Sequence, residues 1–287
     1  MNAIYKKELH NYFTSIAAYL FIAFYMALTG FCITNYSIFS GYSNFAYPLS
    51  ATTTIFIMLM PILTMRILAE EKHQRTDQML LTSPVSITRM VLGKFFAMVT
   101  VLLVGILVVC VYPVILKQYG NVNLKAAYGC IIAFFLFAIT YMSIGMFISA
   151  LTESQAIAAI ATFAVAIITA LVSSFRDSVP AGGAPGFYFT VIAFGVIVVI
   201  LYFLLKNITF CVLLAVAGEA GLFLLYKKQP TAYDGLVGRV IDSISIIDRF
   251  YDFVYEQFSV ASAVYYISIT ALFVFLTIQV VNKRRWS

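Results

Sequence analysis

The side chains that could do chemistry are few, and many of the charged ones lie close together in residues 70–90. Glu70 and Glu71 open this polar stretch, which also contains His73, one of only two histidines in the 287 residues. Neither the phosphate-binding pattern G-x-x-x-x-G-K-S/T nor the zinc-binding pattern H-E-x-x-H occurs. We therefore expect no catalytic, cofactor-binding or metal-binding residues in this chain, and no ATP hydrolysis by a loop of that kind.

Two further charged residues, Arg66 and Glu219, fall within apolar stretches, where a charge is costly and is a functional candidate by default. Arg66 stands one helical turn before Glu70, which predicts an anchor at the inner membrane surface, paired with Glu70 or Glu71. Two interpretations of Glu219 stay open: a structural acid facing a partner donor or a water-filled crevice, or a group that titrates during ion transport. Because an ion relay needs several such groups, the near isolation of Glu219 argues against ion transport.

The elements that must position these residues are membrane helices. Hydrophobic residues make up 62% of the chain and charged residues 10%, against about 25% charged in ordinary soluble domains. The apolar residues fall in blocks about 20 residues long, which is the length that an α-helix needs to cross a bilayer. These values exclude a soluble or disordered chain and predict an all-α polytopic membrane protein.

The net charge of +6 does not indicate a nucleic-acid partner, because Lys and Arg flank the apolar blocks and gather at the chain ends. There they act as anchors toward membrane lipids and as orientation signals, which predicts that both termini are cytosolic and the number of crossings even. Eight crossings result if the hairpin over residues 187–226 spans the membrane, and six if it only dips into it. The predicted spans cover residues 16–36, 51–69, 95–116, 126–150, 155–174, 187–205, 208–226 and 261–281.

Two segments have the pattern of helices that lie in a membrane surface. In residues 2–15, aromatic residues that include Tyr5 and Tyr12 recur on one side, which predicts a basic interfacial helix with its aromatic face in lipid. In residues 236–258, an apolar and a polar stripe run in antiphase, which predicts a second interfacial helix, on the outer side. The apolar stripe is Ile244, Ile247, Tyr251, Val254 and Phe258, and the polar stripe is Asp242, Ser245, Arg249, Asp252 and Glu256.

The polar stretch 70–90 is predicted to connect two spans on the cytosolic side. Within it, residues 74–81 predict a short helix that ends at Ser83-Pro84, with Leu80 and Leu81 on its apolar side. Two interpretations follow from the residues alone. The stretch is either an elbow that converts an outside push into tilting of two membrane helices, or a solvated charged loop.

A longer set of motifs resembles the second span and the coupling-helix region of ABC-2 type permeases. It consists of Pro61-Ile62-Leu63-Thr64-Met65-Arg66, Ala69-Glu70-Glu71-Lys72, Thr76, Leu80-Leu81-Thr82-Ser83-Pro84-Val85-Ser86 and Leu92-Gly93-Lys94-Phe95. The closing residues are similar to the branch with gliding-motility and nitrous-oxide-reductase-accessory permeases; they include Asp248-Arg249-Phe250, Tyr265-Tyr266-Ile267-Ser268 and Arg284-Arg285-Trp286. Three positions depart from the family pattern: Arg75 and Glu256 stand at or near glycine positions, and Gln78 where an acid is common.

The resemblance implies one ABC-2 transmembrane domain over residues 1–287. It would be the permease subunit of an ATP-driven exporter in the plasma (inner) membrane of a prokaryotic-type cell. Residues 1–15 would be the connecting helix, and residues 70–90 the coupling region that docks on a separate ABC ATP-binding subunit. Residues implied in ATPase contact or transmission are Glu70, Glu71, Arg75, Leu80, Leu81 and Pro84, with Gly93 and Lys94 at the return into the next span.

The resemblance also implies partners within the membrane. A second permease copy or a paralogue would complete a dimer, and an auxiliary membrane-anchored subunit with an external domain would dock at residues 236–258. Two other functions stay open: a membrane scaffold that regulates an external partner without transport, and an ion-coupled carrier that depends on Glu219. The apolar composition indicates no particular substrate.

Overall fold

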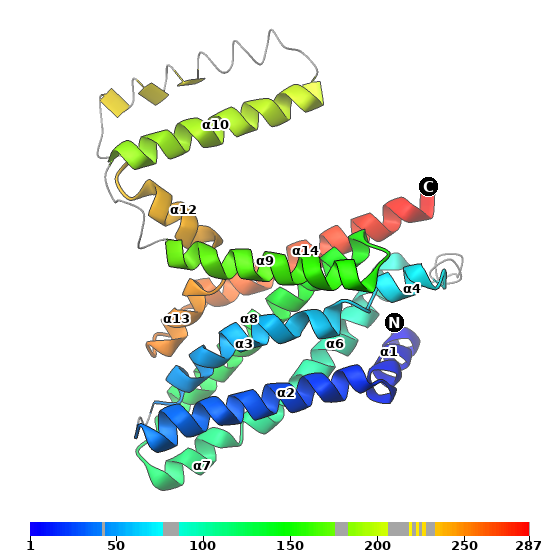
Figure 1. Ribbon diagram of the computed structural model, residues 1–287, viewed down its shortest axis with the longest axis vertical. Helices are drawn as coiled ribbons and strands as arrows, with labels where there is room; N and C mark the ends of the chain where they lie inside the picture. The colour runs from blue at the N-terminus through cyan, green and yellow to red at the C-terminus, as the bar shows by residue number, and fades with distance from the viewer. Residues whose placement is uncertain are drawn as a thin grey trace. The chain divides into compact units, whose positions relative to one another are not determined.

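The computed structural model describes residues 1–41, 44–76, 86–175, 183–205, 218–219, 222–223, 226–227 and 233–286. Regular structure in these ranges is helical, as predicted (Figure 1). The chain forms two compact units, one of Met1–Ala170 with Ile246–Ser287 and the other of Leu171–Ser245. The first unit contains α1 (Asn2–Thr14), α2 (Ile16–Ile33), η1 (Thr34–Phe39), α3 (Ala46–Thr64), α4 (Ala69–His73), α6 (Ile87–Val109), α7 (Tyr112–Tyr119), α8 (Leu124–Leu151), most of α9 (Gln155–Phe175), α13 (Asp248–Val254) and α14 (Val260–Trp286). The second contains the end of α9, α10 (Gly183–Leu205) and α12 (Leu236–Ile244).

Six helical segments among the described residues are long and apolar enough to cross a membrane, and the chain is a multi-pass membrane protein. They are Ile16–Phe39, Ala46–His73, Ile87–Gln118, Leu124–Leu151, Gln155–Val172 and Val260–Arg284. Helix α10 covers the predicted span 187–205, whereas the predicted span 208–226 lies largely outside the described residues. Helix α3 begins before the predicted residue 51, because Asn44 Oδ1 accepts the Ala46 N–H at 2.8 Å and turns the chain into the helix there.

Aromatic side chains around α8 hold the first unit together. Phe56 of α3 meets Phe134 of α8 edge to face, with 5.3 Å between the ring centroids, and Phe137 of α8 lies 5.8 Å from Phe250 of α13. Such ring pairs stabilise a packed core beyond the apolar area that they bury. Helices α3 and α8 come this close because Gly145 has no side chain; a Cβ there would lie 2.5 Å from Thr64 Oγ1. The end of α3 is thereby fixed against α8.

The single interfacial helix predicted for residues 236–258 is interrupted. Helix α12 ends at Ile244 and α13 begins at Asp248, and the Tyr266 hydroxyl donates a hydrogen bond to the Ile246 carbonyl at 2.8 Å. This bond satisfies a backbone acceptor at the interruption. The interruption changes the register of the stripes, so Ser245 of the polar stripe is buried and Tyr251 of the apolar stripe is 40% exposed.

Helix α1 packs against α6, and the predicted placement of its aromatic side in lipid is wrong for Tyr12. The Tyr12 ring is buried, and its hydroxyl donates to the Leu63 carbonyl at 3.0 Å. The Tyr5 hydroxyl lies 2.9 Å from Thr100 Oγ1 on α6. A tyrosine has an apolar ring and a polar tip, and the protein surface formed by α6 and the end of α3 offers a partner for both.

Candidate functional site

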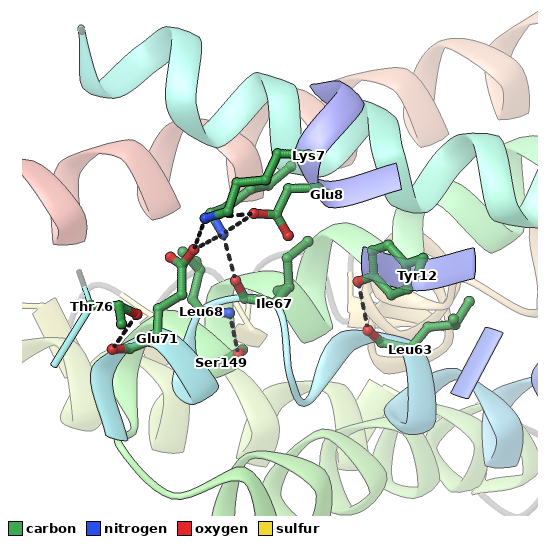
Figure 2. A network of polar contacts seen from close by, with 10 residues as sticks. Lys7, Glu8, Tyr12, Leu63, Ile67, Leu68, Glu71, Thr76 and Ser149 are labelled. Carbon is green, nitrogen blue, oxygen red and sulfur yellow. Dashed lines mark hydrogen bonds and ion pairs between the residues drawn. The ribbon is translucent and has the colours of Figure 1, made fainter. Parts of the chain in front are cut away.

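The polar site begins where the second span is interrupted, between the end of α3 at Thr64 and the start of α4 at Ala69. Ser149 of α8 binds this interruption through its hydroxyl (Figure 2). Its Oγ accepts the N–H groups of Leu68 and Ala69, at 3.3 and 3.0 Å, and donates to the Met65 carbonyl at 3.2 Å. One hydroxyl can donate one hydrogen bond and accept two, so Ser149 uses its full capacity on backbone groups that the helices leave unpaired.

A second contact joins α4 to the end of α8. The largely buried Lys72 donates from Nζ to the Ala150 carbonyl. The last carbonyls of a helix have no partner within the helix and carry partial negative charge, which favours a cation there. Together, Ser149 and Lys72 attach α4 rigidly to α8.

The centre of the site is a buried cluster of charges on three helices. Lys94 of α6 is fully buried, and its Nζ lies 2.7 Å from Glu71 Oε1 of α4 and 3.1 Å from Glu8 Oε1 of α1. The same Nζ donates to the Ile67 carbonyl at 3.1 Å, so each of the three ammonium donors has an acceptor. Lys7, with a side chain 55% exposed, lies 3.8 Å from Glu71 and 4.0 Å from Glu8.

The cluster is electrostatically balanced, since Lys7 and Lys94 pair with Glu8 and Glu71. Figure 2 shows Lys7 between Glu8 and Glu71. A buried charge is tolerated only when it is paired and hydrogen-bonded, and removing one partner of such a pair costs about 3–5 kcal/mol. The arrangement therefore ties α1, α4 and α6 to one another, because moving any one helix away leaves a charge unpaired.

Two more features bring α1 close to this cluster. A Cβ on Gly93 would lie 3.3 Å from Ile4 Cγ2 and 3.4 Å from the Met1 carbonyl oxygen, so glycine allows the start of α1 to approach α6. The Tyr12 hydroxyl bonds to α3, and burial, followed by the nearby Glu8 carboxylate, raises the pKa of this hydroxyl far above its usual value. Tyr12 therefore remains a neutral hydrogen-bond donor.

Helix α4 ends in a turn that normally favours glycine. Arg75 has φ of 58°, the Arg75 N–H donates to the Lys72 carbonyl at 3.1 Å, and the Thr76 N–H donates to the Glu71 carbonyl at 3.0 Å. This is the Schellman arrangement, whose left-handed residue is usually glycine because a Cβ is strained there.

Helix α13 ends in the same way. Glu256 has φ of 62° and donates from its N–H to the Phe253 carbonyl, and the Gln257 N–H donates to the Asp252 carbonyl at 3.0 Å. Both positions at which a glycine would be expected are therefore left-handed, and both are occupied by larger residues.

Of the predicted site residues, the structure brings Arg66, Glu70, Glu71 and Lys94 together around one cavity, and Gly93 lies beside them against the start of α1. Arg75 forms the turn after α4. The predicted ion pair of Arg66 with Glu70 or Glu71 does not form among the described residues: Glu71 pairs with Lys94, and Arg66 and Glu70 are joined through the backbone, where the Glu70 N–H donates to the Arg66 carbonyl at 3.2 Å.

Other predicted positions lie elsewhere. The described segment that contains Glu219 belongs to the second unit, and the Glu219 side chain is exposed. Leu80, Leu81 and Pro84, with most of the predicted helix 74–81, lie outside the described residues.

Sequence reasoning missed Glu8, Lys7 and Ser149. A signal for Glu8 was available: it is the only acidic residue before Glu70, and it stands three residues after Tyr5 and four before Tyr12. An isolated acid on the apolar side of a helix points to a buried cation, but nothing local indicates that the cation is Lys94. Ser149 gives no sequence signal, because a serine in an apolar helix is common.

The cluster forms one wall of a cavity of about 380 Å³. Its lining contains both charge signs and several amides and hydroxyls: Lys7, Glu8, Asn11, Tyr12, Thr14, Ser15, Arg66, Ile67, Glu70, Glu71, Gln74, Thr76 and Lys94. Within the described ranges, no group of three or more His, Cys, Asp or Glu residues could hold a metal ion.

A family model described as "ABC-2 family transporter protein" matches residues 3–282. Neither the curated proteins nor the solved structures give a match.

Proposed function

The chain belongs to the ABC-2 transporter family, and on this premise we propose that it is the membrane-spanning permease subunit of an ATP-driven transporter. ATP binds to and is hydrolysed on a separate ABC ATP-binding subunit, and this chain supplies the membrane path without catalytic residues or a cofactor of its own. The proposal includes export as the direction of transport. It also includes membership of the branch with gliding-motility and nitrous-oxide-reductase-accessory permeases, because of the motifs in residues 61–95 and 245–286.

The buried ion pair between Lys94 and Glu71 carries this proposal. Glu71 lies on α4, at the start of the coupling region of residues 70–90. Its Oε1 is 2.7 Å from Lys94 Nζ, and Lys94 is fully buried. A push on the coupling region by the ATPase therefore moves α4, and through Lys94 also α6. Glu8 extends the same movement to α1, since its carboxylate lies 3.1 Å from Lys94 Nζ.

The remaining assignments follow from this arrangement and the family. Residues 1–15 act as the connecting helix, residues 70–90 as the coupling region, and residues 236–258 as an external dock for an auxiliary subunit. Both termini lie in the cytosol, and the protein works in the plasma (inner) membrane of a prokaryotic-type cell with a second permease copy or a paralogue. The contact or transmission residues are Glu70, Glu71, Arg75, Leu80, Leu81, Pro84, Gly93 and Lys94.

Affinity purification of the tagged full chain from its native membrane, with mass spectrometry of the bound proteins, tests the proposal. We expect an ABC ATP-binding subunit at near one-to-one stoichiometry, and its loss in Leu80→Asp, because a charge at an apolar contact is costly to bury. Glu153→Gln, an exposed change on the described surface, serves as the matched control. Absence of any ATP-binding subunit, under conditions that preserve other such complexes, would contradict the proposal.

A further inference from the structure

The cavity beside the buried charge cluster has a lining with equal numbers of opposite charges. Lys7, Arg66 and Lys94 supply the cations, and Glu8, Glu70 and Glu71 supply the carboxylates. Its volume of about 380 Å³ lies in the range of ligand sites in proteins. A lining of this kind does not select a simple anion or a simple cation, since each would meet a like charge within the same cavity.

Ion pairs within the cluster involve two of the three cations and two of the three carboxylates of the cavity lining, which leaves Arg66 and Glu70. Lys94 and Lys7 are engaged with Glu8 and Glu71. Among the residues that the structure describes, Arg66 and Glu70 form no ion pair, and the Glu70 carboxylate accepts one hydrogen bond from Gln74 Nε2, at 3.4 Å. One guanidinium and one carboxylate at the same cavity suit a ligand that carries a phosphate and an ammonium group.

The cavity lies where membrane helices end. Thr14 and Ser15 of its lining precede the span that begins at Ile16, and Arg66 follows the end of α3 at Thr64. Just beyond Ser15, the Ile16 side chain is 80% exposed. Polar groups at the end of a span, followed by exposed apolar residues, match the depths of a lipid headgroup and its acyl chains.

We propose that this cavity binds the headgroup of a phosphatidylethanolamine-type lipid, with its phosphate on Arg66 and its ammonium on Glu70. The primary ammonium donates hydrogen bonds to a carboxylate, which a trimethylated ammonium cannot do. The exposed amide of Asn11 lines the same cavity and offers a further donor to the phosphate. The lipid is a resident ligand at the joint of α1, α3 and α4, and its binding does not depend on the ATPase or on the cargo.

Native mass spectrometry of the purified full chain in mild detergent tests this site. The detergent is supplemented in turn with palmitoyl-oleoyl phosphatidylethanolamine, phosphatidylcholine and phosphatidylglycerol at equal concentration. We expect the one-to-one ethanolamine lipid adduct to exceed the other two by about tenfold, the effect of one charged hydrogen bond. Comparable adducts with all three lipids would overturn the proposal without the need for any variant.

Two variants separate the roles of the charges. Glu70→Gln is expected to reduce the ethanolamine lipid to the level of phosphatidylcholine, and Arg66→Gln to reduce all three lipids by about tenfold, because all carry the phosphate. Glu153→Gln and Arg89→Gln are the matched controls, since both residues are exposed and neither lines the cavity. Equal losses in the controls would overturn the assignment.

Soluble competitors distinguish a lipid headgroup from a free phosphate compound. Phosphoethanolamine at millimolar concentration is expected to displace part of the bound lipid, and inorganic phosphate to displace none. If inorganic phosphate competes as well as phosphoethanolamine, the site recognises phosphate alone and the zwitterionic assignment is wrong.

Discussion

Lys94 Nζ lies 3.1 Å from Glu8 Oε1, although 86 residues separate the two along the chain. Beside this pair, Gly93 leaves room for Ile4, so that two neighbouring residues of α6 hold α1 in place by different means. Lys94 attracts the helix through charge, and Gly93 permits its approach by lacking a side chain. The terminal helix is thus part of the same mechanical unit as α4 and α6.

The charge cluster is expected to be stabilising only as a complete set. Lys94→Met leaves Glu8 and Glu71 with the exposed Lys7, at 4.0 and 3.8 Å, in place of the buried Lys94, and is expected to lower the free energy of unfolding by about 3 kcal/mol. The triple variant Glu8→Gln, Glu71→Gln, Lys94→Met removes three of the four charges, leaves only the exposed Lys7, and is expected to recover most of this loss. Thermal unfolding of the purified chain in detergent measures both, and equal destabilisation of the two variants would show that charge balance is not the cause.

The same triple variant tests transmission. In the complex with the ATPase, we expect nucleotide trapping to change hydrogen–deuterium exchange both in residues 70–76 and in α1. In the triple variant the change in α1 is expected to disappear while that in residues 70–76 remains, because the connection through Lys94 is gone. The surface pair of the exposed Glu153 and the half-buried Arg284, both changed to Gln, is the control. A persistent response of α1 in the triple variant would argue against the cluster as the connection.

Replacement of Ser149 is expected to lower the free energy of unfolding, because its hydroxyl is the hydrogen-bond partner of backbone groups. Ser149→Ala leaves the Leu68 and Ala69 N–H groups without their acceptor and is expected to cost about 1–3 kcal/mol. Ser143→Ala, also buried on α8, removes only a bond to the Thr140 carbonyl of the same helix and is expected to cost less than about 1 kcal/mol. Chemical denaturation of the two variants in mixed micelles compares them directly.

The crossing of α3 and α8 is expected to tolerate no added methyl group. Gly145→Ala places a Cβ within 2.5 Å of Thr64 Oγ1 and 2.7 Å of Met60 Cε, and is expected to destabilise by about 1–3 kcal/mol. Gly195→Ala in α10 meets nothing within 4 Å and is expected to stabilise by about 0.4–1 kcal/mol. Melting temperatures that fall by equal amounts in the two variants would rule out steric crowding at Gly145.

The two left-handed turns are expected to gain from glycine. Arg75→Gly and Glu256→Gly relieve the strain of a Cβ at positive φ, worth about 1–2 kcal/mol per residue, against an entropic cost of about 0.5–1 kcal/mol. A net gain in stability of up to about 1.5 kcal/mol is therefore expected at each site. Arg75→Ala and Glu256→Ala keep the Cβ and are expected to bring no such gain, so thermal unfolding of the two pairs separates backbone strain from loss of the charged side chain.

The membrane class and most of the spans are determined by the sequence itself, because apolar blocks about 20 residues long have few alternatives to membrane helices. The sequence itself also identifies the polar stretch after residue 70. It likewise identifies Arg75 and Glu256 as unusual, because they stand at or near positions where glycine is expected. These properties depend on composition, spacing and local chain geometry, all of which the linear pattern contains.

Tertiary structure alone decided which charges meet. The spacing of Glu8 and Tyr12, four residues apart, is local to α1, but only the packing of α1 against α6 brings Glu8 to Lys94. The interruption at residues 65–68 likewise depends on Ser149, some 80 residues later, which accepts hydrogen bonds from the Leu68 and Ala69 N–H groups. The physical reason is that a buried charge or an unpaired backbone group is stabilised by whichever partner the fold brings near, and that partner leaves no trace in the local pattern.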